Sequence, residues 1–118
     1  MISGIGVDII EIERIKKAID RWGDSFLTHV FTEEEIAYAQ KYKNPAQHYA
    51  ARFAAKEAVY KAIDNKRHPL GWKDIKILND SRGKPYCIIN DTDFNQEILI
   101  SLSHSDNYAV ANAIITSE

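Results

Sequence analysis

The feature that most limits how this chain can fold is a run of alanines near its middle. Between Ala46 and Ile63 an alanine recurs every few positions, and alanine has the highest intrinsic preference for helix. The run contains Ala50, Ala51, Ala54, Ala55, Ala58 and Ala62. Such small side chains also let other elements pack close to the helix backbone. Because Asn44-Pro45 interrupts the preceding pattern, we expect one long helix from about Ala46 to Ile63.

The N-terminal segment from Ile2 to Ile10 predicts a strand, because apolar residues alternate along it. One face carries Ile5, Val7 and Ile9. The other carries Gly4, Gly6 and Asp8, together with Ile2 and Ile10. Two glycines and an aspartate on one face leave space for another group to approach the backbone closely.

Shorter elements are predicted between this strand and the long helix. A helix is expected over residues 11–22, with Gly23 as its C-cap. Its apolar stripe consists of Ile12, Ile15, Ile19 and Trp22. We interpret residues 23–30 as a loop. The pattern Thr32–Glu35 is a capping box, and it begins a short helix that ends near Tyr42.

Alternating apolar residues predict four strands after the long helix. In chain order these strands cover residues 75–78, 86–89, 98–102 and 108–115. We expect them to form an antiparallel meander. The predicted fold class is therefore α+β, an antiparallel sheet packed with a long alanine-rich helix and shorter helices, in a single domain over residues 1–118.

Charge and composition exclude several classes of protein. The net charge of −2 argues against a nucleic-acid binder, although every lysine and arginine lies at or before Lys84, mostly in the helical part. No apolar run approaches the roughly 20 residues that a membrane span needs. The N-terminus lacks the basic and apolar regions of a secretory signal. With one cysteine, Cys87, no disulfide forms within the chain, and a cytoplasmic location is expected.

Two acidic residues lie where simple solvation does not explain them. Asp8 belongs to the apolar first strand, and Glu57 belongs to the alanine-rich helix. Two carboxylates in a partly apolar cleft repel each other unless a divalent cation lies between them. Mg²⁺ takes one or two carboxylates together with waters and substrate phosphates. Without a metal, Asp8 would cap the next helix, and Glu57 would pair with Lys61 one turn further on.

Three basic residues of the same helix suit phosphate binding, namely Arg52, Lys56 and Lys61. Arg52 and Glu57 are five residues apart, so their side chains diverge by roughly 140° around the helix axis. If both act on one substrate, two subunits must contribute; otherwise Arg52 solvates the outer face of the helix. His104 and Ser105, at a hairpin tip, either bind a phosphate or ribose or form an ordinary turn.

Six segments together resemble one family along nearly the whole chain. They are GIGVDIIEIERI (4–15), FTEEE (31–35), RFAAKEAVYKA (52–62), WKDI (72–75), GKP (83–85) and SLSHSDNYAVA (101–111). They resemble the holo-acyl-carrier-protein synthases, the small bacterial 4′-phosphopantetheinyl transferases. The resemblance implies an enzyme of fatty acid biosynthesis, within lipid metabolism. It would transfer the 4′-phosphopantetheine arm of coenzyme A to a serine of apo acyl carrier protein and release adenosine 3′,5′-bisphosphate.

The resemblance also assigns roles to individual residues. It implies a Mg²⁺ cofactor held by Asp8 and Glu57 on the coenzyme A pyrophosphate, which Lys61 contacts, so that these three residues are catalytic. It implies a homotrimer of the transferase fold with active sites between subunits. The neighbouring subunit would hold coenzyme A through Arg52, His104 and Ser105. A segment near the adenine includes Lys84 and Pro85.

Further expectations concern the base, the protein partner and one departure from the family. Glu57, directly or through a metal-bound water, ranks before Glu35 as the base for the serine, since the capping box already explains Glu35.

Acyl carrier proteins are acidic, so a basic helical stripe would dock one. That stripe consists of Arg14, Lys17 and Arg21. After the long helix, Asp64-Asn65 replaces a glycine-rich family segment, with Lys66 and Arg67 to offset the negative charge.

The alternative function is a non-catalytic module that binds coenzyme A or acyl carrier protein. The retention of Asp8, Glu57 and Lys61 together speaks against it, because a module that only binds needs no pair of metal ligands.

Overall fold

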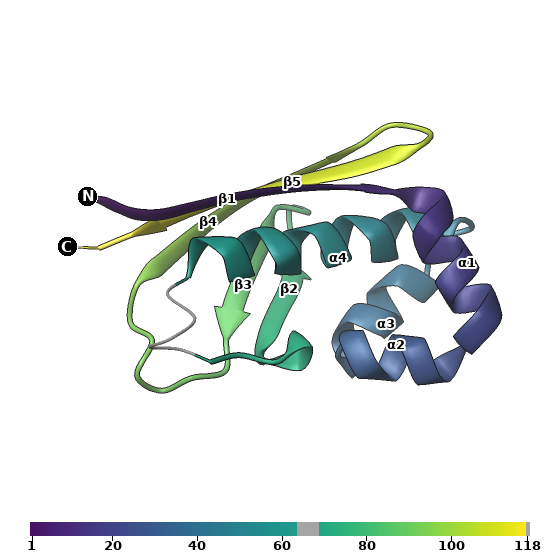
Figure 1. Cartoon of the computed structure of the whole chain (residues 1–118), viewed down its shortest axis with the longest axis horizontal. Helices are drawn as coiled ribbons and strands as arrows, with labels where there is room; N and C mark the ends of the chain where they lie inside the picture. Colours follow the sequence, from purple (N-terminus) through teal and green to yellow (C-terminus); the bar gives the residue numbers. More distant parts are fainter. Residues whose placement is uncertain (64–68, 118) are drawn as a thin grey trace.

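Figure 1 shows a computed structural model of the chain, which describes residues 1–63 and 69–117. The elements of the described residues are, in chain order, β1 (Ile2–Glu11), α1 (Ile12–Trp22), α2 (Asp24–Val30), α3 (Glu33–Gln40), α4 (Pro45–Ala62), the 3₁₀ helix η1 (Trp72–Asp74), β2 (Ile75–Asn79), β3 (Pro85–Ile89), β4 (Glu97–His104) and β5 (Tyr108–Thr116). The predicted α+β class, with one long alanine-rich helix and shorter helices, is confirmed.

The strands form two antiparallel sheets. One sheet has the order β1-β5-β4, so the first strand of the chain pairs with the last. The other is the hairpin of β2 and β3. The meander predicted from the sequence is therefore confirmed for the pairs β2–β3 and β4–β5 and wrong for β3 and β4, which belong to different sheets. Alternation of apolar residues tells which way a side chain faces, but it does not tell which strand lies alongside.

Helix α4 lies between the two sheets, with the three-stranded sheet along one side and the hairpin along the other (Figure 1). Its alanines allow this, since Ala50, Ala54, Ala55 and Ala58 are fully buried. The inner face of β5 is built from equally small residues, namely Ala109, Ala111 and Ala113. Small side chains on both elements let the helix and the sheet approach closely.

Strand β1 comes so near to α4 that two positions on its inner face have room only for glycine. A Cβ atom on Gly6 would lie 2.0 Å from the carbonyl oxygen of Ala58, and one on Gly4 would lie 2.1 Å from that of Ala62. The space predicted beside Asp8 is therefore filled by the backbone of α4. Because Asp8 shares this face of the strand, its side chain also points toward the helix.

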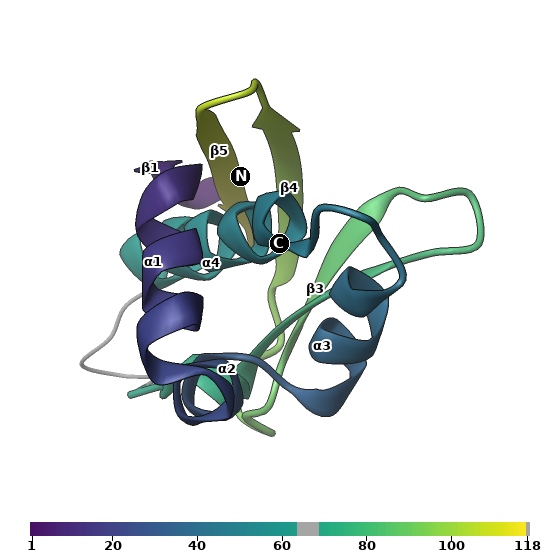
Figure 2. The same ribbon diagram turned by 90° about the vertical axis from the view of Figure 1, so that its right-hand side faces the viewer.

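The three short helices gather at the N-terminal end of α4 (Figures 1 and 2). The predicted C-cap Gly23 has a φ of 55°, and the predicted capping box between Thr32 and Glu35 is present. The stretch interpreted as a loop is instead helix α2, which buries Leu27 and Val30. A helix of seven residues depends on tertiary packing for its stability, and its sequence carries little periodic signal.

The apolar stripe of α1 is shorter than predicted. Ile12 and Ile15 are buried and Ile19 packs against the core, whereas Trp22 is 56% exposed. Trp22 is the last residue of α1, so the helix carries its ring past the edge of the core.

The outer face of the three-stranded sheet is apolar and exposed. Ile5, Val7 and Ile9 turn away from α4, and Ile5 is 71% exposed. Ile5 lies opposite Ile114 of β5, which lies opposite Leu99 of β4. An apolar row thus crosses all three strands on the side that faces away from the helix.

Candidate active site

Asp8 of β1 meets Glu57 and Lys61 of α4 beside the close contact between the two elements. The Nζ atom of Lys61 lies 3.2 Å from Oδ1 of Asp8 and donates to the carbonyl oxygen of Val7 at 3.0 Å. Glu57 is near enough to Asp8 and Lys61 for both charges to influence its pKa. The structure therefore brings together the three residues that the sequence singled out for metal and phosphate chemistry.

The simpler explanation of Asp8 does not hold, whereas Lys61 does interact with Glu57 through its charge. Glu11, and not Asp8, occupies the N-cap position of α1, and Asp8 lies inside β1. Lys61 makes its ion pair with Asp8 on another element. The side chain of Asp8 is 17% exposed and that of Lys61 is 51% exposed, so the pair lies at the mouth of the site.

The electrostatics of this site disfavour the charged form of Glu57. Burial raises the pKa of Glu57, and the neighbouring Asp8 carboxylate raises it further, while Lys61 lowers it. When the pH is lowered, Glu57 therefore takes up its proton at a higher pH than an ordinary glutamate does.

Paired carboxylates in this arrangement fit Mg²⁺. The ion is commonly bound through one or two carboxylates and completes its shell with waters and substrate phosphates. Within residues 1–63 and 69–117, no group of three or more His, Cys, Asp or Glu side chains is placed to hold a metal ion. An ion here would thus depend on substrate and water for its other ligands, and it would relieve the repulsion between Asp8 and Glu57.

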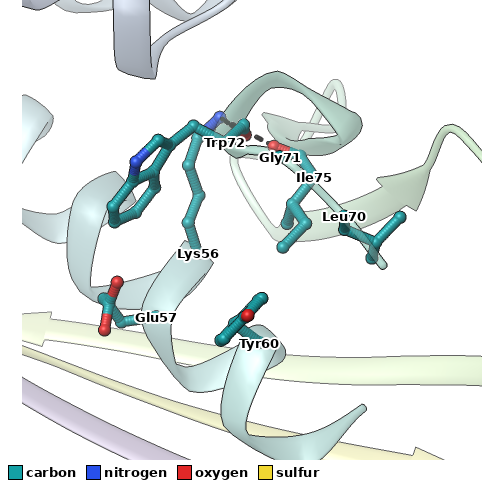
Figure 3. A pocket seen from close by; sticks show the side chains of 7 residues that line it. All are labelled: Lys56, Glu57, Tyr60, Leu70, Gly71, Trp72 and Ile75. Carbon is teal, nitrogen blue, oxygen red and sulfur yellow. Dashed lines mark hydrogen bonds between the residues drawn. The ribbon is translucent and has the colours of Figure 1, made fainter. Parts of the chain in front are cut away.

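A cavity of about 260 Å³ opens beside Glu57 (Figure 3). It is lined by Lys56, Glu57, Tyr60, Leu70, Gly71, Trp72 and Ile75. The Trp72 ring stacks on Phe53, with ring centroids 4.9 Å apart. Rings and aliphatic groups make the lining mostly apolar, which suits a weakly polar ligand.

Burial excludes two of the predicted candidates from direct chemistry. Lys56 and Glu35 are both fully buried, and they form an ion pair with 2.8 Å between Nζ and Oε1. The prediction that Lys56 is available to hold phosphates is therefore wrong. Glu35 has no access to an attacking hydroxyl, which leaves Glu57 as the candidate base.

Arg52 faces away from Glu57. Its guanidinium donates to Oδ1 of Asn79 and lies 4.0 Å from the ring centroid of Tyr38. The residue is 2% exposed, so the alternative that it merely solvates the outer face of the helix is wrong. Arg52 does not line the cavity beside Glu57, which agrees with the angle expected between the two positions.

A cluster of rings links the surroundings of Arg52 to His104. The ring of Tyr38 lies 5.7 Å from that of His48, which lies 6.4 Å from that of His104. Tyr42 stacks on His48 at 3.8 Å between centroids. The structure thus groups Arg52 with His104, apart from Glu57. Sequence reasoning missed His48 and Tyr42. His48 lies four residues before Arg52 on α4, a spacing that places both side chains on one face of the helix.

The other predicted ligands of coenzyme A lie in turns. The Oγ atom of Ser105 accepts hydrogen bonds from the backbone N–H groups of Asn107 and Tyr108, so within one chain the turn explanation accounts for it. Lys84 is exposed in the turn before β3, and Pro85 is the first residue of that strand. Their contacts with coenzyme A, like those of Arg52 and His104, stay predictions.

The basic stripe of α1 lies on the surface. Arg14, Lys17 and Arg21 are all exposed. The guanidinium of Arg21 lies 4.8 Å from the ring centroid of the exposed Trp22, an arrangement that attracts the cation to the ring face. We call these four residues the basic surface of α1. It combines positive charge with one large aromatic side chain.

The remaining sequence predictions concern residues away from the site. Asp64, Asn65, Lys66 and Arg67, where the chain departs from the family, lie outside the described residues. Burial raises the pKa of the Cys87 thiol to about 12, so the thiol stays protonated and is no nucleophile. Among the helices of the described residues, none has the length and apolar character to cross a membrane.

Comparisons with known proteins show the family of this chain. Residues 4–113 match the model of the 4′-phosphopantetheinyl transferase superfamily. A holo-[acyl-carrier-protein] synthase of Thermodesulfovibrio yellowstonii is 51% identical over 98% of this chain and all of its own length. One of Protochlamydia amoebophila is 46% identical over 99% of this chain and all of its own. The crystal structure of a Bacillus anthracis holo-(acyl-carrier-protein) synthase, in complex with CoA (3′,5′-ADP), superposes with a TM-score of 0.85 at 39% identity, covering 100% of this chain and 99% of the other.

The fold and the match over residues 4–113 therefore show a 4′-phosphopantetheinyl transferase fold, and the chain belongs to that superfamily. Within it, the relatives that match over the full length make this chain one of the enzymes of the holo-[acyl-carrier-protein] synthase group, as the sequence motifs predicted.

Proposed function

We propose that this chain transfers the 4′-phosphopantetheine group of coenzyme A to a serine of apo acyl carrier protein in a Mg²⁺-dependent reaction. Adenosine 3′,5′-bisphosphate is the other product. The observation that carries the proposal is the meeting of Asp8 and Lys61 with Glu57, which also lines a cavity. It is supported by the names of the relatives and by the ligand of the Bacillus anthracis structure.

Each of these residues has a distinct part in the mechanism. The serine oxygen attacks the phosphorus that bears the pantetheine arm, and the bond from that phosphorus to the bridging oxygen of the pyrophosphate breaks. Glu57 accepts the serine proton, directly or through water. The exposed ammonium of Lys61 offsets the charge of the departing phosphate. Asp8 and Glu57 would hold Mg²⁺, which supplies charge neutralisation of the pyrophosphate.

The cavity beside Glu57 suits the pantetheine arm, because its lining is mostly apolar. We further propose that the enzyme acts in the cytoplasm, in fatty acid biosynthesis. Support for this comes from the acyl carrier protein in the names of its relatives, since such carriers present growing acyl chains as thioesters.

Mass spectrometry tests the proposed reaction directly. Apo acyl carrier protein incubated with coenzyme A, Mg²⁺ and this enzyme is expected to gain the mass of one phosphopantetheine group, and chelation of the metal is expected to stop the gain. The alternative, a module that only binds coenzyme A or the carrier protein, predicts intact binding with no gain of mass.

We also propose that three copies of the chain form the functional unit, with the outer face of the three-stranded sheet between them. The apolar row of Ile5, Ile114 and Leu99 supports this, because a row of this kind is usually covered by protein. The opposite directions of Arg52 and Glu57 on α4 support it further. Two copies would then be needed to place both side chains on one substrate molecule.

The proposed trimer predicts that a charge at the centre of this face disperses the assembly. Ile5→Glu is expected to yield a folded monomer that has lost most of its transferase activity, because an unpaired carboxylate would be buried between subunits. Light scattering coupled to gel filtration gives the mass, and the conservative variant Ile5→Leu serves as the control. A wild-type monomer with full activity would contradict the proposal.

The basic surface of α1 predicts how the acidic carrier protein docks. The variant with Lys17→Glu and Arg21→Glu together is expected to raise KM for the carrier protein by about tenfold or more and to flatten its salt dependence. KM for coenzyme A should stay unchanged. Lys41→Glu, an exposed charge change on α3's C-cap, is the matched control. A change confined to coenzyme A would contradict the docking assignment.

A further inference from the structure

The buried ion pair of Lys56 and Glu35 is the strongest polar feature that the mechanism leaves unused. Both residues are 0% exposed. The Nζ atom of Lys56 lies 2.8 Å from Oε1 of Glu35, 2.9 Å from the carbonyl oxygen of Trp72 and 2.7 Å from that of Ile75. An ammonium group has three N–H donors, and here each of them has an acceptor.

The carboxylate of Glu35 is satisfied as fully. Its Oε1 accepts a hydrogen bond from the backbone N–H of Thr32, and its Oε2 accepts one from that of Ile77, both at 2.8 Å. Together with Lys56, these bonds join the start of α3, the middle of α4, η1 and β2. One ion pair thus fixes four elements relative to one another.

The pair is costly to bury, and what it provides in return is a hold on the backbone around it. Removing two charges from water is costly, and well-packed apolar side chains of similar size are often as stable as a buried pair. Burial lowers the pKa of Lys56, and the adjacent Glu35 opposes that shift. Apolar side chains would avoid the cost of desolvation, but they would leave the four backbone groups that the pair bonds without partners.

The location of the pair points to another use. Lys56 directly precedes Glu57, and the segment whose carbonyls it holds, Trp72 to Ile75, forms the cavity wall across from that carboxylate. In Figure 3 the Lys56 side chain runs from α4 up to this wall, with the two hydrogen bonds at its tip. The length of one lysine side chain therefore sets the width of the cavity next to Glu57.

We propose that the Glu35–Lys56 pair is a positioning device for the reaction, because it holds the Trp72–Ile75 wall at a fixed distance from Glu57. This inference rests on the proposed function, in which the pantetheine arm lies against that wall. A wall that is free to move would let the reacting phosphorus shift relative to Glu57, and displacements of about 1 Å at a reacting centre can cost about 100-fold in rate.

The test replaces both charges at once. The double variant Glu35→Gln with Lys56→Met keeps the volume and removes both charges, but it leaves the carbonyl oxygens of Trp72 and Ile75 without a donor. Tm is therefore expected to fall by several degrees, which thermal unfolding measures, while the protein still folds. The constant kcat is expected to fall by about 10- to 100-fold, while KM for coenzyme A changes by less than about threefold. Trp72 fluorescence, measured in a Trp22→Phe background, is expected to become more accessible to acrylamide. A double variant with wild-type kcat and quenching would overturn the inference.

A second variant covers the case in which the double variant does not fold. Glu35→Asp keeps both charges but moves the carboxylate back by one methylene, and it is expected to lower kcat and increase the quenching of Trp72 in the same direction. A folded Glu35→Asp with unchanged kcat and quenching would likewise overturn the inference. The quenching measurement needs no substrate, so it tests the positioning role separately from the reaction. If the wild type transferred no phosphopantetheine, the proposed function would be wrong. The quenching of Trp72 would still show whether the pair holds the wall.

Discussion

Glu57→Gln is expected to abolish transfer while leaving the protein as stable as the wild type, or more stable. Loss of a carboxylate that holds the metal and accepts the serine proton should lower kcat by more than about 100-fold, since outer-shell partners of a metal alone cost 10- to 100-fold. Burial and Asp8 disfavour the ionised Glu57 in the folded protein, so the neutral amide removes an unfavourable charge. Initial rates and thermal unfolding of the same samples measure both effects.

The matched control for this variant is Glu33→Gln, which removes the charge of an exposed glutamate in the first turn of α3. It should retain full activity. A Glu57→Gln enzyme with near wild-type turnover, or one that is inactive only because it has unfolded, would contradict the assignment of Glu57.

Gly6→Ala is expected to be strongly destabilising although it adds a single methyl group. The new Cβ would lie 2.0 Å from the carbonyl oxygen of Ala58 and 2.9 Å from its carbonyl carbon. These are backbone atoms of α4, while β1 is held on its other side by pairing with Ala113. Neither element has an easy way to move, so the free energy of unfolding should fall by about 3 kcal/mol. Chemical denaturation measures the change.

Gly71→Ala provides the comparison, because its added Cβ would meet only the side chain of Asp74 at 3.5 Å. Its φ of −90° suits any residue, so its stability should be unchanged or slightly increased. Gly6→Ala should also impair activity beyond its effect on folding, because Asp8 follows two residues later and would move away from Glu57. Equal stabilities for the two variants would contradict the close packing of β1 on α4.

These two predictions use the part of the architecture that the sequence revealed most clearly. The alanines of α4 and the glycines beside Asp8 are complementary, since each removes side-chain volume from one contact. Periodicity placed Asp8 and the two glycines on one face of β1, and i, i+4 spacing placed Glu57 one turn before Lys61. The sequence did not show that β1 lies against α4, and the structure adds this contact.

Other features depend on partners that lie far apart in the sequence. Nothing local indicates that β1 pairs with β5, or that Glu35 reaches Lys56 and the backbone of Ile77. A signal for the buried pair does exist. Lys56 stands among alanines that are buried on all sides of the helix, and a lysine in such a position requires an acidic partner. The pairing of Glu35 with Lys56 was not predicted, because the capping box already gave Glu35 a structural role.

The central claim is that Asp8 and Glu57 together hold the ion on which coenzyme A is bound. A crystal grown with Mn²⁺ in place of Mg²⁺ and with coenzyme A tests this most directly, through the anomalous scattering of the metal. We predict one anomalous peak between the two carboxylates, in contact with the pyrophosphate, and its loss in Glu57→Gln. Coenzyme A bound in an active enzyme with no metal at these two residues would contradict the claim.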